Sequence, residues 1–375
     1  MKIEMVDLKG QYEKIKSKID HAVLKVISEA NFINGSIVNE FAQNLSSFLG
    51  GAYVIPCANG TDALQLALMS LDLEPGDEII IPAFTYVATA EVIGLLKLKP
   101  IMVDVDINTY NLKIENIEAA ITPRTKVIVP VHLFGQCVDM EPLLNLAKHY
   151  GLYVIEDAAQ AIGAVYTFKN GIKKQAGTIG HIGCTSFFPS KNLGCFGDGG
   201  AVFTNDEGLA KKIRMIANHG QVKKYVHKYI GINSRLDSMQ AAVLNIKLQF
   251  LNEYSFERET AADRYDLYLK NINEIILPTR TKNSTHVFHQ YTIRVLNDRR
   301  DSLKNHLESL GIPSMVYYPI PLNRQEAYSK IGEVVGVIDS TNCLCGSVLS
   351  LPMHTELTEQ HQEYICSSII SFMNI

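Results

Sequence analysis

The feature that most constrains the fold is the alternation of short β-rich runs with helical stretches from residue 53 to residue 204. We expect strands at 53–56, 78–83, 100–105, 126–132, 152–157, 184–188 and 201–204. Helical periods lie between several of them, at 61–72, 85–97, 114–121 and 140–150. This alternation predicts an α/β fold with a mostly parallel sheet covered by helices on both faces. Because ligands of such sheets bind beyond the carboxyl ends of the strands, functional residues are expected there.

The regions before and after this alternation show different sequence patterns. We expect a helix at 12–30 and another after Gly35 and Ser36, through Phe41, Leu45 and Leu49. One long helix is expected over 238–271, followed by a smaller α+β unit with strands at 289–296 and 314–319 and helices near 301–310 and 358–372. Two domains are therefore predicted. Residues 1–245 form a large α/β domain with N-terminal helices, and residues 246–375 form a linking helix and a small C-terminal α+β domain.

Composition excludes several classes of function. The formal net charge is −4 and lysine pairs are short, so nucleic acid is not an expected partner. No stretch reads as a signal peptide or a membrane span. The seven cysteines include no C-x-x-C pair, which argues against structural zinc and a disulfide framework. We expect a cytoplasmic protein with no metal site and no membrane contact.

The first stretch that could carry chemistry is "CANGTDALQLAL", residues 57–68. A strand ends here and an apolar helical period begins, and the free N–H groups at a helix start form an anion site. Thr61 is expected to cap this helix and to donate its hydroxyl to a phosphate. The alternative is a capped turn with no ligand.

The second stretch is "VIEDAAQAIGA", residues 154–164. Asp157 falls at the carboxyl end of a buried strand, where a carboxylate needs a partner. Facing a ring nitrogen, it would keep that nitrogen protonated. Gln160 lies three residues on and could bind the same ligand. The alternative is an Asp that caps a helix.

The third stretch is "TSFFPSKNLGCFGDGGAVFTND", residues 185–206. It lacks the G-x-x-x-x-G-K-[ST] pattern of a P-loop, because Asn192 follows Lys191. Ser186 ends a strand and could donate to a phosphate, and the later glycines permit close approach of a flat ligand. A partly desolvated Lys191 would have a lowered pKa and react well with carbonyls.

Together these stretches supply a phosphate cradle, an acid for a pyridinium nitrogen and an activated lysine. Pyridoxal 5′-phosphate requires this set of groups. Tyr86, in "PAFTYVATAE", also follows a strand end and could stack on the cofactor ring, or could pack in the core.

At this point the sequence resembles a known family, the DegT/StrS-type nucleotide-sugar aminotransferases. The motifs that carry the resemblance run in the family's order from residue 57 to 354: "CANGTDALQ", "PAFTYVATAE", "VIEDAAQ", "TSFFPSKNLGCFGDGGAVFTND", "GINSRLDSMQAAVL", "VYYPIPLNRQEAY" and "LSLPMH". The resemblance implies the aspartate-aminotransferase fold, which is fold type I of the pyridoxal phosphate enzymes. It also implies a homodimer with active sites at the subunit interface.

The resemblance also implies roles for individual residues. Lys191 would form the Schiff base with pyridoxal 5′-phosphate, and Asp157 would pair with the ring nitrogen. Gln160 would lie near the phenolic oxygen of the ring and Tyr86 in the stacking position. The residues implied at the phosphate are Gly60, Thr61, Asp62, Ser186 and, from the other subunit, Asn233.

Within the family, "NSR", "HGQ" and "YYPIPLN" are most similar to the branch that acts on a UDP-linked 3-keto hexuronic acid, UDP-2-acetamido-2-deoxy-3-oxo-glucuronate. Arg235 would bind the sugar carboxylate with its planar fork. His219, Tyr317 and Tyr318 are implied as further substrate contacts, although the branch tends to have His where this chain has Tyr317. The implied amino donor is glutamate, and the product would serve O-antigen and lipopolysaccharide biosynthesis.

Other functions remain open at this stage. The substrate could be a dTDP-3-keto-6-deoxyhexose or a UDP-4-keto sugar, since Arg also binds pyrophosphate. A non-enzymatic regulator on the same fold is a second alternative, which the intact set of Lys191, Asp157 and Ser186 argues against. Dehydratases of the family carry His in place of the Schiff-base lysine, so a lysine at 191 disfavours that activity.

Overall fold

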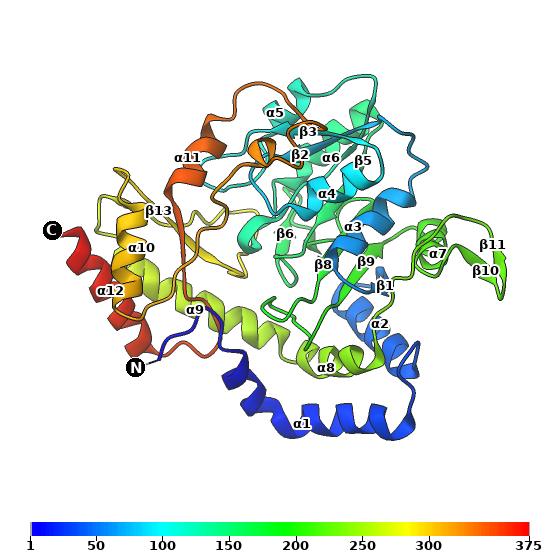
Figure 1. Cartoon of the computed structure of the whole chain (residues 1–375), viewed down its shortest axis with the longest axis horizontal. Coiled ribbons are helices and arrows are strands. Elements are labelled where there is room, and N and C mark those ends of the chain that lie inside the picture. Colours follow the sequence, from blue (N-terminus) through cyan, green and yellow to red (C-terminus); the bar gives the residue numbers. More distant parts are fainter. Residues whose placement is uncertain (1, 375) are drawn as a thin grey trace.

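The computed structural model describes residues 2–374 and places an eight-stranded sheet at the centre of this part of the chain (Figure 1). In spatial order its strands are β1 (Tyr53–Cys57), β9 (Gly200–Thr204), β8 (Ile182–Ser186), β5 (Tyr153–Asp157), β4 (Thr125–Ile128), β2 (Glu78–Pro82), β3 (Lys99–Val103) and β14 (Glu333–Val334). Only β9 is antiparallel to its neighbours within this sheet of the described residues. The predicted mostly parallel sheet is confirmed. Two strands differ most from the prediction: β14 was not predicted, and β4 ends at Ile128 rather than at residue 132.

Helices cover both faces of this sheet, as the alternation predicts. On one face lie α3 (Gly60–Met69), α4 (Ala88–Leu95) and α7 (Glu207–Ile216). On the other lie α5 (Ile114–Ala119), α6 (Met140–Tyr150), α2 (Ser36–Phe48) and α8 (Ser238–Leu248). Side chains alternate along each strand, so Ile79 and Ile81 join one core while Ile80 joins the other. Burial of each such side chain contributes about 1.5–3 kcal/mol.

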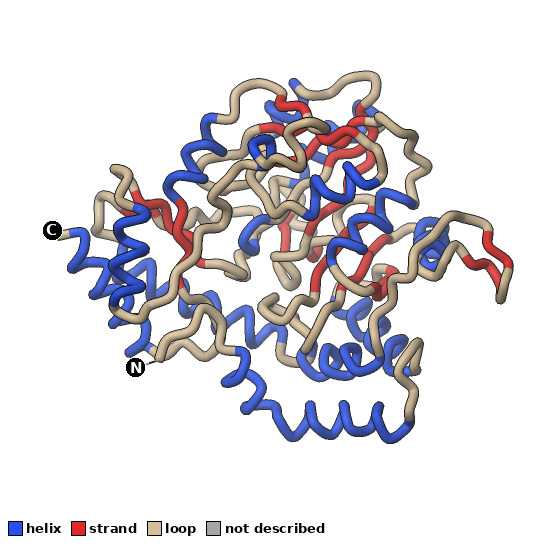
Figure 2. Tube along the Cα trace, in the orientation of Figure 1, coloured by secondary structure: helices blue, strands red, loops and turns tan. Residues whose placement is uncertain are grey.

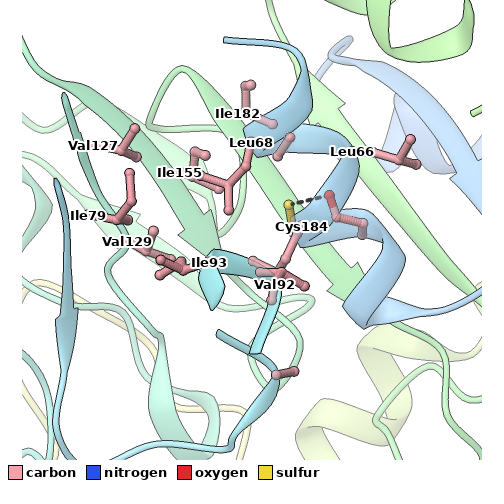
Figure 3. Close-up of a cluster of buried hydrophobic side chains, with 14 of the residues drawn as sticks. Leu66, Leu68, Ile79, Val92, Ile93, Val127, Val129, Ile155, Ile182 and Cys184 are labelled. Atoms are coloured by element: carbon pink, nitrogen blue, oxygen red, sulfur yellow. Dashed lines mark hydrogen bonds between the residues drawn. The ribbon is translucent and has the colours of Figure 1, made fainter. Parts of the chain in front are cut away.

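Figure 3 shows the first of these cores in detail. Leu66 and Leu68 of α3 and Val92 and Ile93 of α4 lie over strand residues of the sheet, and Cys184 of β8 donates its thiol to the carbonyl of Ala63 at 3.3 Å. This packing fixes the start of α3 against the end of β8. Both ends belong to the stretches that the sequence marks as functional.

The N-terminal helix α1 (Leu8–Glu29) lies along α8, as Figure 1 shows. Asp7 caps it by accepting from the N–H of Gly10 at 2.7 Å. Its buried Ile15 and Ile19 pack against Val243 of α8. The predicted helix at 12–30 is confirmed, although it begins four residues earlier.

The single long helix predicted over 238–271 is wrong, because the chain forms two helices there. α8 ends at Leu248 and α9 (Leu251–Leu269) begins after Gln249 and Phe250. Phe250 takes a φ of −104° and a ψ of 0°, its N–H donates to the carbonyl of Lys247, and its ring stacks on Tyr254. The break turns α9 away from the large sheet toward the C-terminal elements (Figure 1). Local helix propensity could not reveal a break that tertiary packing imposes.

The C-terminal part has its own three-stranded sheet and core. Its strands are β12 (Ile275–Ile276), β13 (Tyr291–Val295) and β15 (Val348–Leu351), and its helices are α10 (Arg300–Ser309), α11 (Asp339–Ser347) and α12 (Glu359–Met373). The helices α9, α10 and α12 contribute to one buried cluster with this sheet. In Figure 1 the two chain ends lie on the same side of the molecule, at opposite ends of α12.

The strand predicted at 314–319 is wrong. Only Met315 bridges to Ser350, and β15, which the sequence did not indicate, pairs with β13 instead. Prolines at 319 and 321 supply no N–H for a ladder. The segment instead crosses to the large sheet, where the N–H of Leu322 donates to the carbonyl of Ala83 at 3.0 Å.

Four small strands and two short 3₁₀ turns complete the description. They are β6 (Val165–Thr167), β7 (Lys173–Gln175), β10 (Gln221–Lys223), β11 (Val226–His227), η1 (Leu133–Gly135) and η2 (Leu322–Arg324). The β10–β11 hairpin projects from the body beyond α7, which Figure 2 shows as a red pair of strands at the edge of the view. Within residues 2–374 no helix is long and apolar enough to cross a membrane, and no group of three or more His, Cys, Asp or Glu side chains could hold a metal ion.

Candidate active site

The predicted functional stretches meet at one edge of the large sheet. Asp157 is the last residue of β5 and Ser186 the last residue of β8, and these two strands are parallel neighbours. The chain after β1 begins α3, whose first residue lies directly against Ser186. The carboxyl ends of parallel strands form the usual ligand-binding edge of an α/β sheet.

Asp157 is buried at this edge. Its carboxylate accepts from the hydroxyl of Thr89 at 3.0 Å and from the N–H of Ala159 at 3.1 Å. Burial raises its pKa, and those two donors together with the charges of Lys191 and His132 oppose that rise. A buried carboxylate in this position favours a cationic partner, because removal from water penalises its charge.

The strand end that holds Asp157 is fixed from the opposite side. Glu156 and His132 are both fully buried, and their side chains lie 2.8 Å apart. The N–H of Val138 donates to Nδ1 of His132, so Nε2 carries the ring proton and donates it to Glu156. The Glu156 carboxylate also accepts from backbone N–H groups of Gly177, Ile179 and Gly180. With four donors on one carboxylate, β5 has little freedom to shift.

Lys191 is partly buried and lies on the loop that joins β8 to β9. Burial lowers the pKa of Lys191 to about 8, and the nearby charge of Asp157 opposes the change. The loop is tight, since the N–H of Lys191 donates to the carbonyl of Phe188 at 2.8 Å. A Cβ at Gly194 would collide with the carbonyl oxygen of Pro189. Near neutral pH a useful fraction of Lys191 is therefore an uncharged, nucleophilic amine.

The predicted anion cradle is formed by the start of α3 and the end of β8. A Cβ at Gly60 would lie 2.6 Å from the Cβ of Ser186, so only glycine allows the helix to approach this strand so closely. The first N–H groups of a helix have no partner within the helix, and here they lie beside the hydroxyl of Ser186. Thr61 and Asp62 belong to the same first turn.

The expectation that Thr61 caps α3 is wrong. The capping residue is Asn59, whose side chain accepts from the N–H of Asp62 at 2.8 Å, and the helix begins at Gly60. Asn is among the best capping residues, and its extended backbone suits the position. Thr61 therefore lies within the first turn, where its hydroxyl is not needed as a cap.

A wall of aromatic side chains lies beside Gln160. The side chain of Gln160 accepts from the N–H of Phe134 at 2.8 Å and donates to the hydroxyl of Tyr318 at 3.1 Å. The ring of Tyr318 lies 6.0 Å from Phe84 and 6.1 Å from Tyr86. Tyr86 is 55% exposed and so has a free face, which its expected stacking role requires. The structure thus brings Gln160, Tyr86 and Tyr318 together.

Tyr317 extends this wall. It is half-buried, its ring lies 5.9 Å from that of Tyr318, and burial raises its pKa. Its phenol stays neutral at physiological pH and can act as a hydrogen-bond donor.

Three of the expected site residues, Asn233, Arg235 and His219, form no hydrogen bond with this group in the part of the chain that the structure describes. Ser234 is buried and accepts from the N–H of Ala58, which leaves its neighbour Asn233 exposed and Arg235 partly exposed. Arg235 lines a groove of about 840 Å³ together with Arg214, Asn218 and residues of α2 and β1. His219 is exposed, and its carbonyl oxygen lies 2.8 Å from Nδ1 of His227. Exposed positions are where a residue that contacts another subunit would lie.

Three residues at the site were missed by reasoning from sequence. Thr89 donates to Asp157, Asn192 donates from Nδ2 to the carbonyl of Val287 at 2.8 Å, and His289 is buried close enough to Lys191 for the lysine's charge to lower its pKa. Thr89 could have been noticed in the sequence, because it is a polar residue within the mostly apolar helix expected at 85–97. For His289 no sequence spacing gave a signal, because it lies ninety-eight residues after Lys191.

Comparison with known proteins agrees with this geometry. A family model described as the DegT/DnrJ/EryC1/StrS aminotransferase family matches residues 13–370. The UDP-2-acetamido-2-deoxy-3-oxo-D-glucuronate aminotransferase of Pseudomonas aeruginosa is 47% identical over 98% of this chain and 99% of its own length. A UDP-N-acetyl-3-dehydro-alpha-D-glucosamine 3-aminotransferase of Acidithiobacillus ferrooxidans is 43% identical over 98% of this chain and 97% of its own.

Among solved structures, NtdA of Bacillus subtilis, with the bound cofactor PMP, is similar over the whole of this chain. It has a TM-score of 0.90 and 32% sequence identity, and 86% of its chain is covered.

Proposed function

The chain belongs to the DegT/DnrJ/EryC1/StrS aminotransferase family, and on that premise we propose that it aminates the keto group of UDP-2-acetamido-2-deoxy-3-oxo-glucuronate with glutamate as the amino donor. It is a pyridoxal phosphate-dependent transaminase. The observation that carries the proposal is the placement of Lys191, with its lowered pKa, beside the buried Asp157 at the carboxyl edge of the sheet. A lysine and an acid in this relation serve amino-group transfer.

The residues at this edge fit pyridoxal phosphate. The Gly60–Ser186 contact leaves a cradle of backbone N–H groups and one hydroxyl for the phosphate. Asp157, ionised opposite the ring nitrogen, would keep that nitrogen protonated, and the positive ring would in turn oppose the burial that raises the pKa of Asp157. Gln160, fixed by Phe134 and Tyr318, would bind the ring oxygen, and Tyr86 would cover one ring face. When bound, the cofactor supplies an electron sink conjugated to the amino group under transfer.

Lys191 supplies the acid–base chemistry. Its Nζ takes the proton from the α-carbon of the amino donor and later returns a proton to the carbon of the sugar that becomes aminated. With a pKa of about 8, the side chain can hold and release a proton near neutral pH. The tight loop from Phe188 to Gly194 holds the backbone that carries this side chain.

We assign the sugar contacts to Arg235, His219, Tyr317 and Tyr318. The guanidinium of Arg235 matches a carboxylate bidentately. The relative from Acidithiobacillus ferrooxidans has a glucosamine in its name and the one from Pseudomonas aeruginosa a glucuronate, so the two names differ at the group that Arg235 would bind. The aminated product would serve O-antigen biosynthesis.

We propose that the active unit is a homodimer in the cytoplasm. The exposed Asn233 would bind the phosphate held by the partner subunit. The β10–β11 hairpin and the chain after it expose apolar side chains that a second copy would cover: Val222, Tyr225, Val226 and Ile230. All seven cysteines are free, which suits a reducing compartment.

The test of this function uses a panel of keto nucleotide sugars with glutamate and detects the products by mass. We expect amination of the UDP-3-keto hexuronic acid, no activity in Lys191→Ala, and a visible cofactor band that glutamate bleaches in the wild type alone. The panel includes a dTDP-3-keto-6-deoxyhexose and a UDP-4-keto sugar. Amination of either of these sugars without amination of the UDP-3-keto hexuronic acid would reject the proposed substrate. A wild-type protein that never develops the cofactor band would reject the mechanism.

A further inference from the structure

His289 is a buried histidine beside the active site that the mechanism above does not use. It is 5% exposed, and its Nδ1 is buried with no hydrogen-bond partner in the part of the chain that the structure describes. Two other buried histidines differ in this respect: His132 bonds Glu156 and Val138, and Nδ1 of His286 accepts from the N–H of Phe288 at 3.0 Å. An unpartnered buried nitrogen is costly and requires an explanation.

The backbone around His289 is hydrogen-bonded on one side to the loop that carries Lys191 and on the other to Phe134, which contacts Gln160. Asn192, next to Lys191, donates to the carbonyl of Val287 at 2.8 Å, and the N–H of Gln290 donates to the carbonyl of Phe134 at 3.4 Å. Phe134 in turn donates to Gln160. The imidazole of His289 is therefore carried by a segment that is bonded on both sides to residues adjoining the cofactor site.

The charged groups that act on this imidazole are both cations. The charge of Lys191 acts from the β8–β9 loop and that of Arg258 from α9, where the Arg258 guanidinium donates to the carbonyls of Phe288 and His289 at 3.0 and 3.5 Å. Burial holds the pKa of His289 well below its usual range, and the charges of Lys191 and Arg258 act in the same direction. The charge of Asp157 acts on Lys191 and raises its pKa, in opposition to burial. A neutral imidazole between two cations has one free lone pair and can only accept from them.

We propose that His289 is a positioning residue for Lys191, whose uncharged imidazole accepts a hydrogen bond from the amino group of Lys191 when that group is free. This bond gives the unpartnered nitrogen its donor. It also fixes the direction of the lysine's lone pair, which must point at the carbon that gains or loses a proton. The inference rests on the proposed role of Lys191.

The test measures the pKa of Lys191 itself. Full-length protein freed of cofactor is acetylated with trace acetic anhydride between pH 6 and 10, and the Lys191 peptide is quantified by mass spectrometry. We expect His289→Leu to lower the pKa of Lys191 by about one unit, a tenfold change in the amine–ammonium equilibrium, because the ammonium loses its acceptor. His289→Gln retains an acceptor and is expected to restore the wild-type value.

His286→Leu is the matched control. His286 is equally buried and neutral, with a pKa lowered to about 3, but its Nδ1 is occupied and its ring stacks on Phe288. We expect this variant to leave the pKa of Lys191 unchanged. His289→Phe provides a second acceptor-free variant if the leucine variant does not fold.

An unchanged or raised pKa of Lys191 in a folded acceptor-free variant would overturn the proposal, and so would a glutamine variant that behaves like leucine. The readout needs no substrate. A failure of the sugar panel therefore leaves this result standing, and a failure here leaves the aminotransferase assignment standing.

Discussion

At the scale of single residues, the active site depends on Asp157 and Lys191, and burial makes both side chains harder to ionise. Burial raises the pKa of Asp157 and lowers that of Lys191, so each shift favours the neutral form, while the attraction between the two charges favours ionisation. Asp157 has two hydrogen-bond donors, but among the described residues neither it nor Lys191 belongs to a close ion pair. A ligand with a protonated ring nitrogen and a carbonyl carbon gives Asp157 its cation and Lys191 its electrophile.

Arg235 is the residue whose replacement should separate related substrates. We expect Arg235→Gln to lower kcat/KM for the UDP-3-keto hexuronic acid by roughly 10- to 100-fold, the effect of losing a charge-assisted bidentate contact. The corresponding 3-keto N-acetylglucosamine substrate should change by less than about threefold, because it has no carboxylate to lose. Steady-state kinetics on the two sugars measures the difference.

Arg214→Gln is the matched control, because Arg214 lines the same groove and its guanidinium lies 6.0 Å from the ring centre of Tyr53. It should affect both sugars alike. Equal losses on both sugars in Arg235→Gln would assign Arg235 to the pyrophosphate instead.

At the scale of elements, α8 holds the loop that carries Lys191. Gln240 accepts from the N–H of Phe196 at 2.8 Å and donates to its carbonyl at 3.4 Å. About two turns further on, Lys247 donates to the carbonyl of Gly194 at 2.8 Å, and its ammonium lies 5.2 Å from the ring centre of Phe196. Lys247 is only 2% exposed and burial lowers its pKa to about 8. A helix otherwise used for packing thus fixes the loop through polar groups on one face.

The burial of Lys247 predicts a pH-dependent stability. Its folded pKa lies below its unfolded value of about 10.4, so the unfolded state binds the extra proton and stability rises with pH between about 8 and 10.4. Lys247→Met has no proton to bind there. We therefore expect the free energy of unfolding of wild type, relative to this variant, to rise by up to about 3 kcal/mol across that range.

Denaturant titrations at a series of pH values measure this difference. Lys191 and Arg258 are common to both proteins, so their titrations cancel in the comparison. A flat difference between pH 8 and 10.4 would mean that Lys247 keeps its ordinary pKa in the folded protein.

At the scale of the whole molecule, the C-terminal part completes the site on the large sheet. Asp104, which follows β3, accepts from the N–H groups of Ser340 and Thr341 and so fixes the start of α11 across 236 residues of sequence. β14 adds to the edge of the large sheet beside β3. Between these anchors the chain from Met315 to Leu322 brings Tyr317 and Tyr318 to Gln160. Motion of the C-terminal part would therefore alter the substrate contacts directly.

Subunit mixing tests whether the site is shared between two copies. If Asn233 of one subunit serves the Lys191 of the other, each heterodimer of Lys191→Ala with Asn233→Asp holds one intact site. Both variants alone should be inactive, while an equal mixture, after dissociation and reassociation, should recover up to about a quarter of wild-type activity per subunit. Activity assays on the mixture and size measurements on each variant provide the readout.

Co-purification of affinity-tagged Lys191→Ala with untagged Asn233→Asp measures the extent of subunit exchange in this mixture. If the subunits exchange but the mixture stays inactive, Asn233 acts on the lysine of its own subunit.

The sequence by itself determined the sheet, the helices on its faces and the positions of Asp157, Ser186 and Lys191 relative to the strand ends. Such features are local, because alternation of apolar runs fixes the strands and a residue after a strand end has one edge on which to lie. Only the tertiary structure decided the capping of α3 by Asn59, the break between α8 and α9 and the course of residues 314–319. The same holds for Thr89, Lys247 and His289. Thr89, Lys247 and the segment that leads to Leu322 depend on partners far along the chain, in Asp157, Gly194 and Ala83, and the free energy of such contacts outweighs the local propensity on which sequence reasoning relies. The Asn59 cap is local, but Thr61 is an equally plausible capping residue by type.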